Sequence, residues 1–232
     1  MRKRLLCVIL GIFCLWGCAP SSKMQSVNAA LPVGETTSQT AQKVITVYPG
    51  ATEYYLGEIL DYSWEQTAKP EFVMIHFCSA VVNHPDNPYN HEDVRQTFID
   101  AGVSIHYIID REGEIFCYIP EDRSAWHAGR GTWNNDEAYT NKMNVYSIGI
   151  ELMGIGTQEE MSIYMTKANY NKLKREWIGF TDAQYDSLKD LVADICQRND
   201  IPLDRNHVIG HDQYNPKKND PGDLFDWSRI LP

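Results

Sequence analysis

Residues 72–77 read Phe72-Val73-Met74-Ile75-His76-Phe77, a nearly continuous apolar run with the length of one β-strand. Val145–Met153 is a second run of this kind. Strands whose side chains are apolar on both faces are typical of sheets that are covered on both sides. The two runs therefore predict a central sheet with helices packed against it.

Two further segments have the apolar spacing of amphipathic helices. His91–Ala101 carries apolar residues at helical spacing, and Gly102 follows it as a C-terminal stop. Thr181-Asp182-Ala183-Gln184 has the pattern of a capping box, which predicts the start of a long helix. The apolar stripe of that helix consists of Leu188, Leu191, Val192 and Ile195.

Shorter strand-like runs complete the expected sheet. Val103–Asp110 and Glu114–Pro120 are joined by Arg111-Glu112-Gly113, which predicts a hairpin with glycine in its turn. His207–Gly210 predicts another short strand, and Val44–Tyr48 could form one ahead of an irregular lead-in. This mixture of helices and strands predicts the α/β class, with a mixed central β-sheet flanked by helices.

The N-terminus has the features of an export signal. Arg2-Lys3-Arg4 is basic, and the apolar run Leu5–Trp16 has the length of a signal-peptide core rather than of a membrane span. It ends on Leu15-Trp16-Gly17-Cys18, which resembles the lipobox of bacterial lipoproteins, whose cysteine receives the lipid. Residues 1–18 are therefore expected to be a lipoprotein signal peptide and lipobox, with Cys18 as the lipidation site. The alternatives are a plain secretory signal and an uncleaved membrane anchor, and all three place the remainder outside the cytoplasm.

The segment behind this signal is expected to be a tether. Residues 19–43 are rich in Ser, Thr, Gln, Ala and Pro without sustained periodicity, which predicts a flexible linker ahead of one domain at 44–232, with its core at 70–227. Cleavage before Cys18 would remove three positive charges and change the formal net charge from −10 to −13. Such an acidic surface repels phosphate backbones, which excludes nucleic acid as a general partner. We expect a monomer that is lipid-anchored to a bacterial membrane on its extracytoplasmic side.

The cysteines of the mature chain leave room for at most one disulfide. Cys7 and Cys14 would leave with the signal, so Cys78, Cys117 and Cys196 remain beside the lipid site. Cys78 and Cys117 lie in strand-like segments and could pair across neighbouring strands in an oxidising compartment. The alternative is that these cysteines are small buried hydrophobic residues.

Two histidines and one aspartate lie where a metal could be held. His76 ends a buried strand, where an ionisable group is costly unless it is paired or ligated, so it is either a metal ligand or a satisfied core histidine. His211 follows the strand His207–Gly210 and opens a polar loop that contains Asp220 before a proline. Two imidazoles and one carboxylate form a familiar catalytic zinc set, which leaves the fourth position for water.

Of the other five histidines, one is a candidate contact for a ligand, and four are expected to be surface or structural residues. His127 lies beside an aromatic residue in the glycine-containing loop Trp126-His127-Ala128-Gly129, which suits a ligand contact. The remaining four are expected to be loop surface residues (His84 and His91) or structural residues within strands (His106 and His207).

Glu151 places a carboxylate inside a run that is otherwise fit for the interior of a sheet, Ser147-Ile148-Gly149-Ile150-Glu151-Leu152. A buried carboxylate must be neutral, paired or close to a metal. In a cleft beside zinc it would be a good general base, because burial and the cation tune its pKa. The alternative is an edge-facing glutamate in a salt bridge.

Five sequence blocks then occur in an order that is specific to one family. They are His76, the strand Val103-Ser104-Ile105-His106-Tyr107-Ile108-Ile109, the loop Trp126-His127-Ala128-Gly129, Asn144 with Ser147-Ile148-Gly149-Ile150-Glu151-Leu152, and Gly210-His211 with Lys218-Asn219-Asp220-Pro221-Gly222. Together they closely resemble the type-2 family of zinc N-acetylmuramoyl-L-alanine amidases, relatives of phage lysozyme-type amidases and animal peptidoglycan recognition proteins. The resemblance covers roughly residues 70–227 and is nearest to lipid-anchored bacterial amidases and their cytoplasmic anhydromuropeptide-cleaving cousins.

The resemblance implies a reaction and a role for each matching residue. The reaction is hydrolysis of the amide bond between N-acetylmuramic acid and L-alanine in peptidoglycan or muropeptides, by a single catalytic domain, for cell-wall turnover or remodelling. The matching positions are His76, His211 and Asp220 for one Zn²⁺ per chain, Glu151 and Lys218 for catalysis, and Trp126, His127 and Asn144 for the substrate. In these roles Glu151 is the acid and base, and Lys218 is the positive group over the developing oxyanion.

The chain departs from the family pattern in three places. The loop between His211 and Asp220 is one residue shorter than is usual, Ile105 stands where phage members carry a catalytic tyrosine, and the residues after His76 are less polar. In addition, Gly154–Phe180 looks like a family-variable insertion, which is either a wall or lid of the groove or a surface elaboration.

Two other classes of function remain to be distinguished from hydrolysis of the amide. A non-catalytic peptidoglycan-binding module would bind zinc without cleaving muropeptides. A glycosidase with Glu151 and Asp220 as its paired carboxylates would form new reducing sugar ends and would be indifferent to a chelator.

Overall fold

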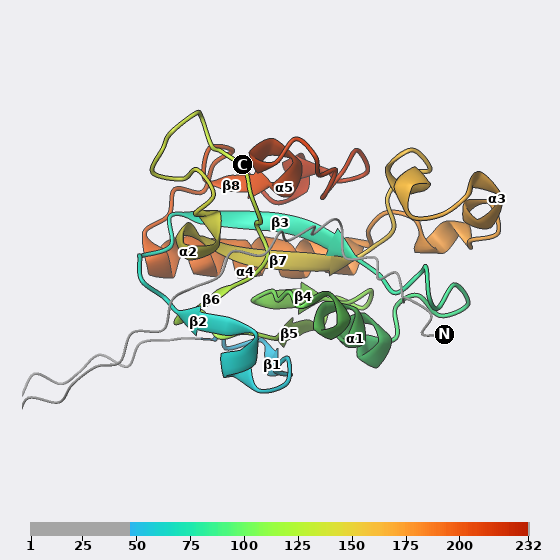
Figure 1. Ribbon diagram of the computed structural model, residues 1–232, viewed down its shortest axis with the longest axis horizontal. Coiled ribbons are helices and arrows are strands. Elements are labelled where there is room, and N and C mark those ends of the chain that lie inside the picture. Colours follow the sequence, from blue (N-terminus) through green and yellow to red (C-terminus); the bar gives the residue numbers. More distant parts are fainter. Residues whose placement is uncertain (1–46, 232) are drawn as a thin grey trace, which may run out of the picture. The chain divides into compact units, whose positions relative to one another are not determined.

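A six-stranded mixed β-sheet forms the centre of the computed structural model, which describes residues 47–231 (Figure 1). Its strands, in the order in which they lie in the sheet, are β1 (Thr52–Glu53), β5 (Ile115–Cys117), β4 (Tyr107–Ile109), β7 (Ser147–Met153), β3 (Phe72–Cys78) and β8 (Val208–Gly210). All seven residues of β3 and of β7 are buried, so the expected α/β class with a covered central sheet is confirmed. The expected signal peptide, Cys18 and the tether at 19–43 lie outside the described residues.

Three neighbouring parallel strands bring distant residues to one end of the sheet. β3 pairs with β7 in parallel, and His76 lies opposite Glu151 in that register. On its other side β3 pairs with β8, where Ile75 lies opposite Gly210, the residue before His211. Ligand sites in sheets of this kind lie at the carboxyl ends of the strands. His76, Glu151 and His211 all lie near that end.

Helices α1 (His91–Ala101) and α4 (Asp182–Asn199) pack on opposite faces of the sheet (Figure 1). The side chains of β4 alternate between them: Tyr107 and Ile109 belong to the hydrophobic cluster of α4, and Ile108 belongs to the cluster of α1. The four apolar residues predicted to form the core stripe of α4 are fully buried. α4 therefore buries the face that its apolar spacing predicted, and α1 buries Val94 and Phe98 of its predicted face but leaves Ala101 exposed.

Both long helices begin and end where their sequence signals lie. The Asn90 side chain caps α1 by accepting from the Asp93 N–H, and Gly102 ends the helix with a φ of 65°. Such a positive φ favours glycine, because it has no Cβ. Thr181 and Gln184 form the predicted capping box of α4.

Shorter elements surround the sheet. β2 (Ser63–Glu65) and β6 (Arg123–Ala125) form an antiparallel pair, and β6 leads into the loop 126–129. The remaining elements are the short helices α2 (Met143–Tyr146), α3 (Lys167–Tyr170) and α5 (His211–Tyr214), and the 3-10 turns η1 (Ile59–Asp61), η2 (Glu160–Ile163), η3 (Arg175–Trp177) and η4 (Trp227–Arg229). Within residues 47–231, none of the helices has both the length and the apolarity needed to cross a lipid bilayer.

Several strand predictions were too long. The expected strand Val103–Asp110 is reduced to Tyr107–Ile109. Ahead of it, the Ser104 hydroxyl donates to the carbonyl oxygen of Tyr62 and accepts from the backbone N–H of Trp126, so this segment is bonded to loops and not to a neighbouring strand of the sheet. The strand predicted at Val145–Met153 begins only at Ser147, because Val145 and Tyr146 belong to α2. The strand predicted at His207–Gly210 begins one residue later, at Val208.

The N-terminal lead-in also differs from its expectation. The described part of Val44–Tyr48 is not a strand, because Ala51 N–H bonds Tyr48 O in a turn and Tyr48 N–H donates to the Tyr107 hydroxyl. The sheet strand of this region is β1 instead. His91, expected on a loop surface, is the first residue of α1, and its Nε2 lies 3.1 Å from Asp110 Oδ2.

The disulfide expectation for Cys78 and Cys117 is wrong. β7 and β4 separate β3 from β5 in the sheet, so the two cysteines are not on neighbouring strands. Cys78, Cys117 and Cys196 are all buried and free. The alternative of small buried hydrophobic residues is therefore correct.

Candidate metal centre

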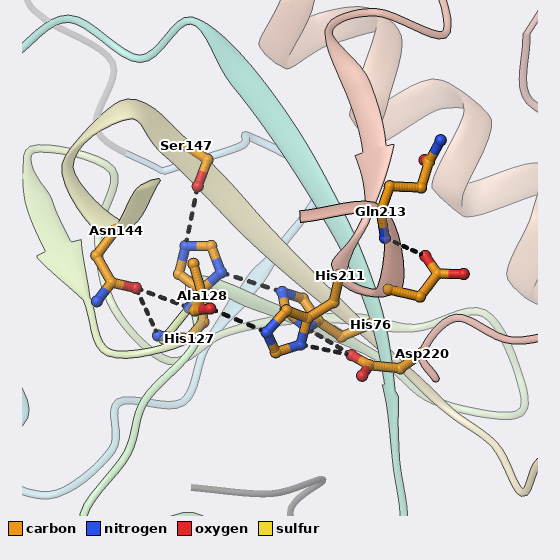
Figure 2. Close-up of polar contacts among 9 residues, drawn as sticks. His76, His127, Ala128, Asn144, Ser147, His211, Gln213 and Asp220 are labelled. Carbon is orange, nitrogen blue, oxygen red and sulfur yellow. Dashed lines mark hydrogen bonds and ion pairs between the residues drawn. The ribbon is translucent and has the colours of Figure 1, made fainter. Parts of the chain in front are cut away.

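Three side chains converge at the carboxyl end of β3 and β8. His76 comes from β3, His211 is the first residue of α5, and Asp220 comes from the loop that follows. Asp220 Oδ2 lies 2.8 Å from His76 Nδ1 and 3.0 Å from His211 Nδ1, as Figure 2 shows. One donor atom of each residue lies within 4.8 Å of those of the others, and all three side chains are buried. The structure therefore brings together the three residues predicted as metal ligands.

The contacts of His211 and Asp220 fit a site for a cation. His211 Nε2 lies 3.0 Å from the carbonyl oxygen of Ala128. Because a carbonyl oxygen can only accept a hydrogen bond, Nε2 carries a proton, and Nδ1 is the ring nitrogen directed at Asp220. In addition, Asp220 Oδ1 is buried and has no hydrogen-bond partner among the described residues. A buried carboxylate is costly unless it is paired or bound to a metal, and two imidazoles with one carboxylate are a common zinc set.

The charge states of the ligands suit this arrangement. Burial lowers the pKa of His76 to about 4, so its ring is neutral near pH 7. Burial also opposes ionisation of Asp220, but the adjacent His211 and His76 outweigh it and hold the pKa of Asp220 below its ordinary value. Neutral imidazoles and an ionised carboxylate are the forms that bind metals.

Glu151 lies next to this cluster on β7 and is only 5% exposed. Burial raises its pKa well above the ordinary value and the charge of Asp220 adds to the rise, while Lys218 and the thiol of Cys78 oppose it. Its Oε2 is buried and has no hydrogen-bond partner within residues 47–231. The expected alternative, an edge-facing glutamate, is wrong because β7 lies between β4 and β3. Glu151 is thus a buried carboxyl group with the perturbed pKa that is typical of catalytic acids and bases.

Lys218 lies close to the same groups despite the shortened loop. Its backbone N–H donates to Asn215 O in a turn of that loop, and its side chain is half-buried. Its positive charge lowers the pKa of both Glu151 and His76. The loop therefore brings an ammonium group near the candidate base and the candidate metal ligands.

The three predicted substrate residues occupy different environments. Trp126 is 49% exposed, and its ring centroid lies 4.1 Å from that of Trp64 on β2. The imidazole of His127 is buried and faces His76, with 3.0 Å between His127 Nδ1 and His76 Nε2. Asn144 Oδ1 accepts from the backbone N–H groups of His127 and Ala128 (Figure 2). Of the three, only Trp126 presents a large exposed surface.

The insertion at 154–180 packs against the loop that carries Asp220. Glu160 on η2 is buried, and its Oε1 accepts from the backbone N–H of Asp223 at 2.7 Å. Its carbonyl oxygen accepts from the Asn219 side chain at 3.0 Å. The insertion therefore packs directly on the loop that carries Asp220. Residues 164–173 of the insertion and residues 81–86, after β3, line a pocket of about 380 Å³.

Sequence reasoning missed several residues around the site. Trp64 lay in the lead-in, where the pattern was ambiguous. Glu160 lay in an insertion with no predicted contacts. Ser147 could have been found, because it is a polar residue that opens an otherwise apolar strand. Its Oγ lies 3.3 Å from His127 Nε2.

Comparisons with known proteins identify similar amidases. An AmpD from Citrobacter freundii, named a 1,6-anhydro-N-acetylmuramyl-L-alanine amidase, is 36% identical over 129 residues, which are 55% of this chain and 55% of the relative. The N-acetylmuramoyl-L-alanine amidase AmiD of Escherichia coli K12 is 30% identical over 142 residues, 58% of this chain and 45% of the relative. The chain thus spans about half the length of the curated relatives it matches.

Solved structures give the same result. A crystal structure of an AmpD derivative superposes with a TM-score of 0.60 at 25% identity, over 82% of this chain and 97% of the other. The complex of E. coli AmiD with anhydro-N-acetylmuramic acid-L-Ala-D-gamma-Glu-L-Lys has a TM-score of 0.52 at 28% identity, over 71% of this chain and 58% of that one. Residues 66–223 match the family model Amidase_2, described as N-acetylmuramoyl-L-alanine amidase, and the chain belongs to this family.

Proposed function

We propose that this protein hydrolyses the amide bond between N-acetylmuramic acid and L-alanine in peptidoglycan or muropeptides, in cell-wall turnover or remodelling. One observation carries the proposal: the buried Glu151 lies opposite His76 in the sheet, beside two further candidate ligands of a metal. The printed names of the AmpD and AmiD relatives support this bond as the target.

The metal of this proposal is Zn²⁺, held by His76, His211 and Asp220. Zn²⁺, when bound, supplies Lewis acidity, which polarises the amide carbonyl and favours deprotonation of a water molecule. The three side chains are buried and lie within hydrogen-bond distance of one another, so they would hold the ion in a fixed position beside Glu151.

Glu151 is the proton carrier in this mechanism. It takes the proton of the attacking water and returns it to the nitrogen of the leaving L-alanine. Burial favours its protonated form, and the charge of Lys218 favours its ionised form. These opposed influences suit a group that must both accept and donate a proton during one turnover.

Lys218 stabilises the negative charge that develops on the carbonyl oxygen. A single well-placed donor of this kind contributes on the order of 3 kcal/mol to the transition state. Trp126, half-exposed and packed against Trp64, offers an apolar ring surface to the saccharide part of the substrate.

The proposed location is the extracytoplasmic side of a bacterial membrane, with the chain lipid-anchored through Cys18 and monomeric. The basic and apolar segments of residues 1–18 support this location, and peptidoglycan lies in the same compartment. Mass spectrometry of the mature N-terminus tests it: a diacylglyceryl cysteine at position 18 is expected. A soluble mature chain that begins elsewhere would contradict it.

The decisive experiment for the reaction uses a defined muropeptide and mass spectrometry of its products, with and without a chelator. We expect a free stem peptide that begins with L-alanine, and no product when the chelator is present. New reducing sugar ends that persist with chelator would instead favour a glycosidase. Stoichiometric zinc without any cleavage would favour a binding module.

A further inference from the structure

One short loop contacts both histidines of the candidate metal centre on the side away from Asp220. His127 places its ring nitrogen Nδ1 3.0 Å from His76 Nε2. The next residue, Ala128, places its carbonyl oxygen 3.0 Å from His211 Nε2. Figure 2 shows both contacts to the left of the two histidines, with Asp220 on their right. The outer nitrogen of each histidine is thus engaged by neighbouring residues of the same loop.

The chain of contacts behind His127 determines where its proton lies. Ser147 Oγ donates its only proton to the Met143 carbonyl oxygen at 2.7 Å. Toward His127 Nε2, at 3.3 Å, Ser147 can therefore only accept. The proton of the neutral His127 ring is consequently on Nε2, and its Nδ1 is an acceptor.

This result places a proton on His76 Nε2 as well. Because His127 Nδ1 accepts, His76 Nε2 must donate, and Nδ1 is then the ring nitrogen that His76 directs at Asp220. His211 is turned in the same way, since Ala128 O holds its Nε2 proton. Both rings therefore direct Nδ1 to the position where a metal would lie.

Three further features hold the loop in this position. Asn144 Oδ1 accepts from the backbone N–H of His127 at 3.0 Å and of Ala128 at 2.7 Å. Gly149 on β7 leaves space for the His127 ring, because a Cβ there would lie 2.6 Å from His127 Nδ1. His106 fills the space beside His127, with its Nδ1 accepting from the Gly149 N–H at 3.0 Å.

We propose that His127, Asn144 and Ser147 are positioning residues of the metal centre, which set the proton positions of both histidine ligands before the metal binds. This inference rests on the proposed zinc centre, but not on hydrolysis of the amide. It assigns to His127 and Asn144 a task other than contact with the substrate. Outer partners of this kind typically change metal affinity about 10–100-fold when they are removed.

The test compares two substitutions of His127 in the full chain. His127→Leu cannot accept from His76, whereas His127→Gln offers an amide oxygen to His76 and an amide N–H to Ser147. Zinc dissociation constants are measured by competition with a chelating dye, without substrate. We expect about 10–100-fold weaker zinc binding in His127→Leu and in Asn144→Leu, about tenfold in Ser147→Ala, and largely restored binding in His127→Gln.

A second readout follows the proton positions directly. Nitrogen-15 NMR of the histidine rings in the zinc-free protein, above the ordinary pKa of histidine, is expected to show His76 and His211 protonated at Nε2. Ser147→Ala should introduce the other tautomer at His76 while His211 is unchanged. His84→Leu, the same substitution at an exposed histidine on a loop, is the matched control and should alter neither zinc binding nor these signals.

Two outcomes would overturn the proposal. One is unchanged zinc affinity in His127→Leu, together with a raised KM for muropeptide, as a pure substrate contact would give. The other is an unprotonated Nε2 in His76 or His211 of the wild-type protein. Wild-type protein that binds zinc but leaves muropeptides intact would contradict the proposed function and not this inference. Thermal unfolding of every variant identifies any that fails to fold, and for such a variant the Ser147→Ala and NMR results decide.

Discussion

Glu151 and His76 lie directly opposite each other on adjacent parallel strands, at the carboxyl end of the sheet. Backbone hydrogen bonds of the sheet, rather than a flexible loop, therefore set the separation between the candidate base and a candidate metal ligand. Sites built on strands and helices are held more accurately than sites on loops.

Replacement of Glu151 by glutamine should separate metal binding from catalysis. The amide keeps the size of the side chain but cannot accept and return a proton, so we expect zinc to remain bound and kcat/KM to fall by about 10²–10⁴-fold. Zinc content and muropeptide turnover are the measurements, with Glu112→Gln as an exposed control. Turnover near that of the wild type would remove Glu151 from the mechanism.

Replacement of Asp220 by asparagine should strongly weaken the metal site. The substitution removes the one negative charge that faces both histidine ligands, so we expect zinc affinity to fall by about 100-fold or more. Zinc retained after dialysis is measured alongside activity, and excess zinc should restore part of the activity. Asp223→Asn, an exposed site in the same loop, should behave as the wild type. Retained zinc in Asp220→Asn would show that the metal lies elsewhere.

His106 should make the fold sensitive to acid. Burial lowers its pKa from 6.5 to about 4, so between these values the unfolded chain binds a proton that the folded chain does not. The free energy of unfolding should therefore be undiminished above pH 6.5, fall as the pH drops toward 4, and change no further through this group below that. The loss is on the order of 3 kcal/mol.

Urea unfolding at several pH values, with chelator present, measures this dependence. His106→Gln cannot be protonated and should show a shallower slope between pH 6.5 and 4 than the wild type does. Equal slopes in the two proteins would assign the acid sensitivity to other buried groups.

Glu160 should stabilise the loop that carries Asp220. Its carboxylate accepts from the backbone N–H groups of Asp223 and Thr157, and Glu160→Ala leaves both donors without this partner. We expect a loss of about 1–3 kcal/mol in the free energy of unfolding and weaker zinc binding. Glu159→Ala, its exposed neighbour, is the control. Unchanged zinc affinity in Glu160→Ala would mean that the insertion packs on the loop without supporting the ligand.

Trp126 should contribute to substrate binding alone. Trp126→Ala removes an exposed aromatic surface, and since such contacts are worth about 1 kcal/mol, we expect KM for muropeptide to rise about three- to tenfold. Zinc affinity should be unchanged. Leu203→Ala, another partly exposed apolar residue, serves as the comparison. A fall in kcat at constant KM would contradict this role.

Local patterns predicted the elements that depend on local physics. β3, α1 and α4 appear where apolar spacing and capping residues indicated, because those signals act within a few residues along the chain. The set of His76, His211 and Asp220 was also predictable, since His76 lies near the end of a recognisable strand, His211 follows another and Asp220 precedes a proline.

Features that depend on strand order were not predictable from such patterns. The wrong disulfide expectation arose because nothing local shows that two strands separate Cys78 from Cys117. The direction of the His127 side chain likewise depends on Gly149, which lies on a different strand. The short extent of β4 follows from contacts of Ser104 with remote backbone.

The separation of the candidate ligands along the chain has a consequence for the folding of the protein. His76 and Asp220 are 144 residues apart, and β8 must join β3 before His211 can face either of them. A chain that is only partly synthesised or partly folded therefore cannot assemble the complete set of ligands. If the centre binds zinc as we propose, the metal would complete a site that exists only in the folded domain, and the proposed hydrolysis would begin only after folding.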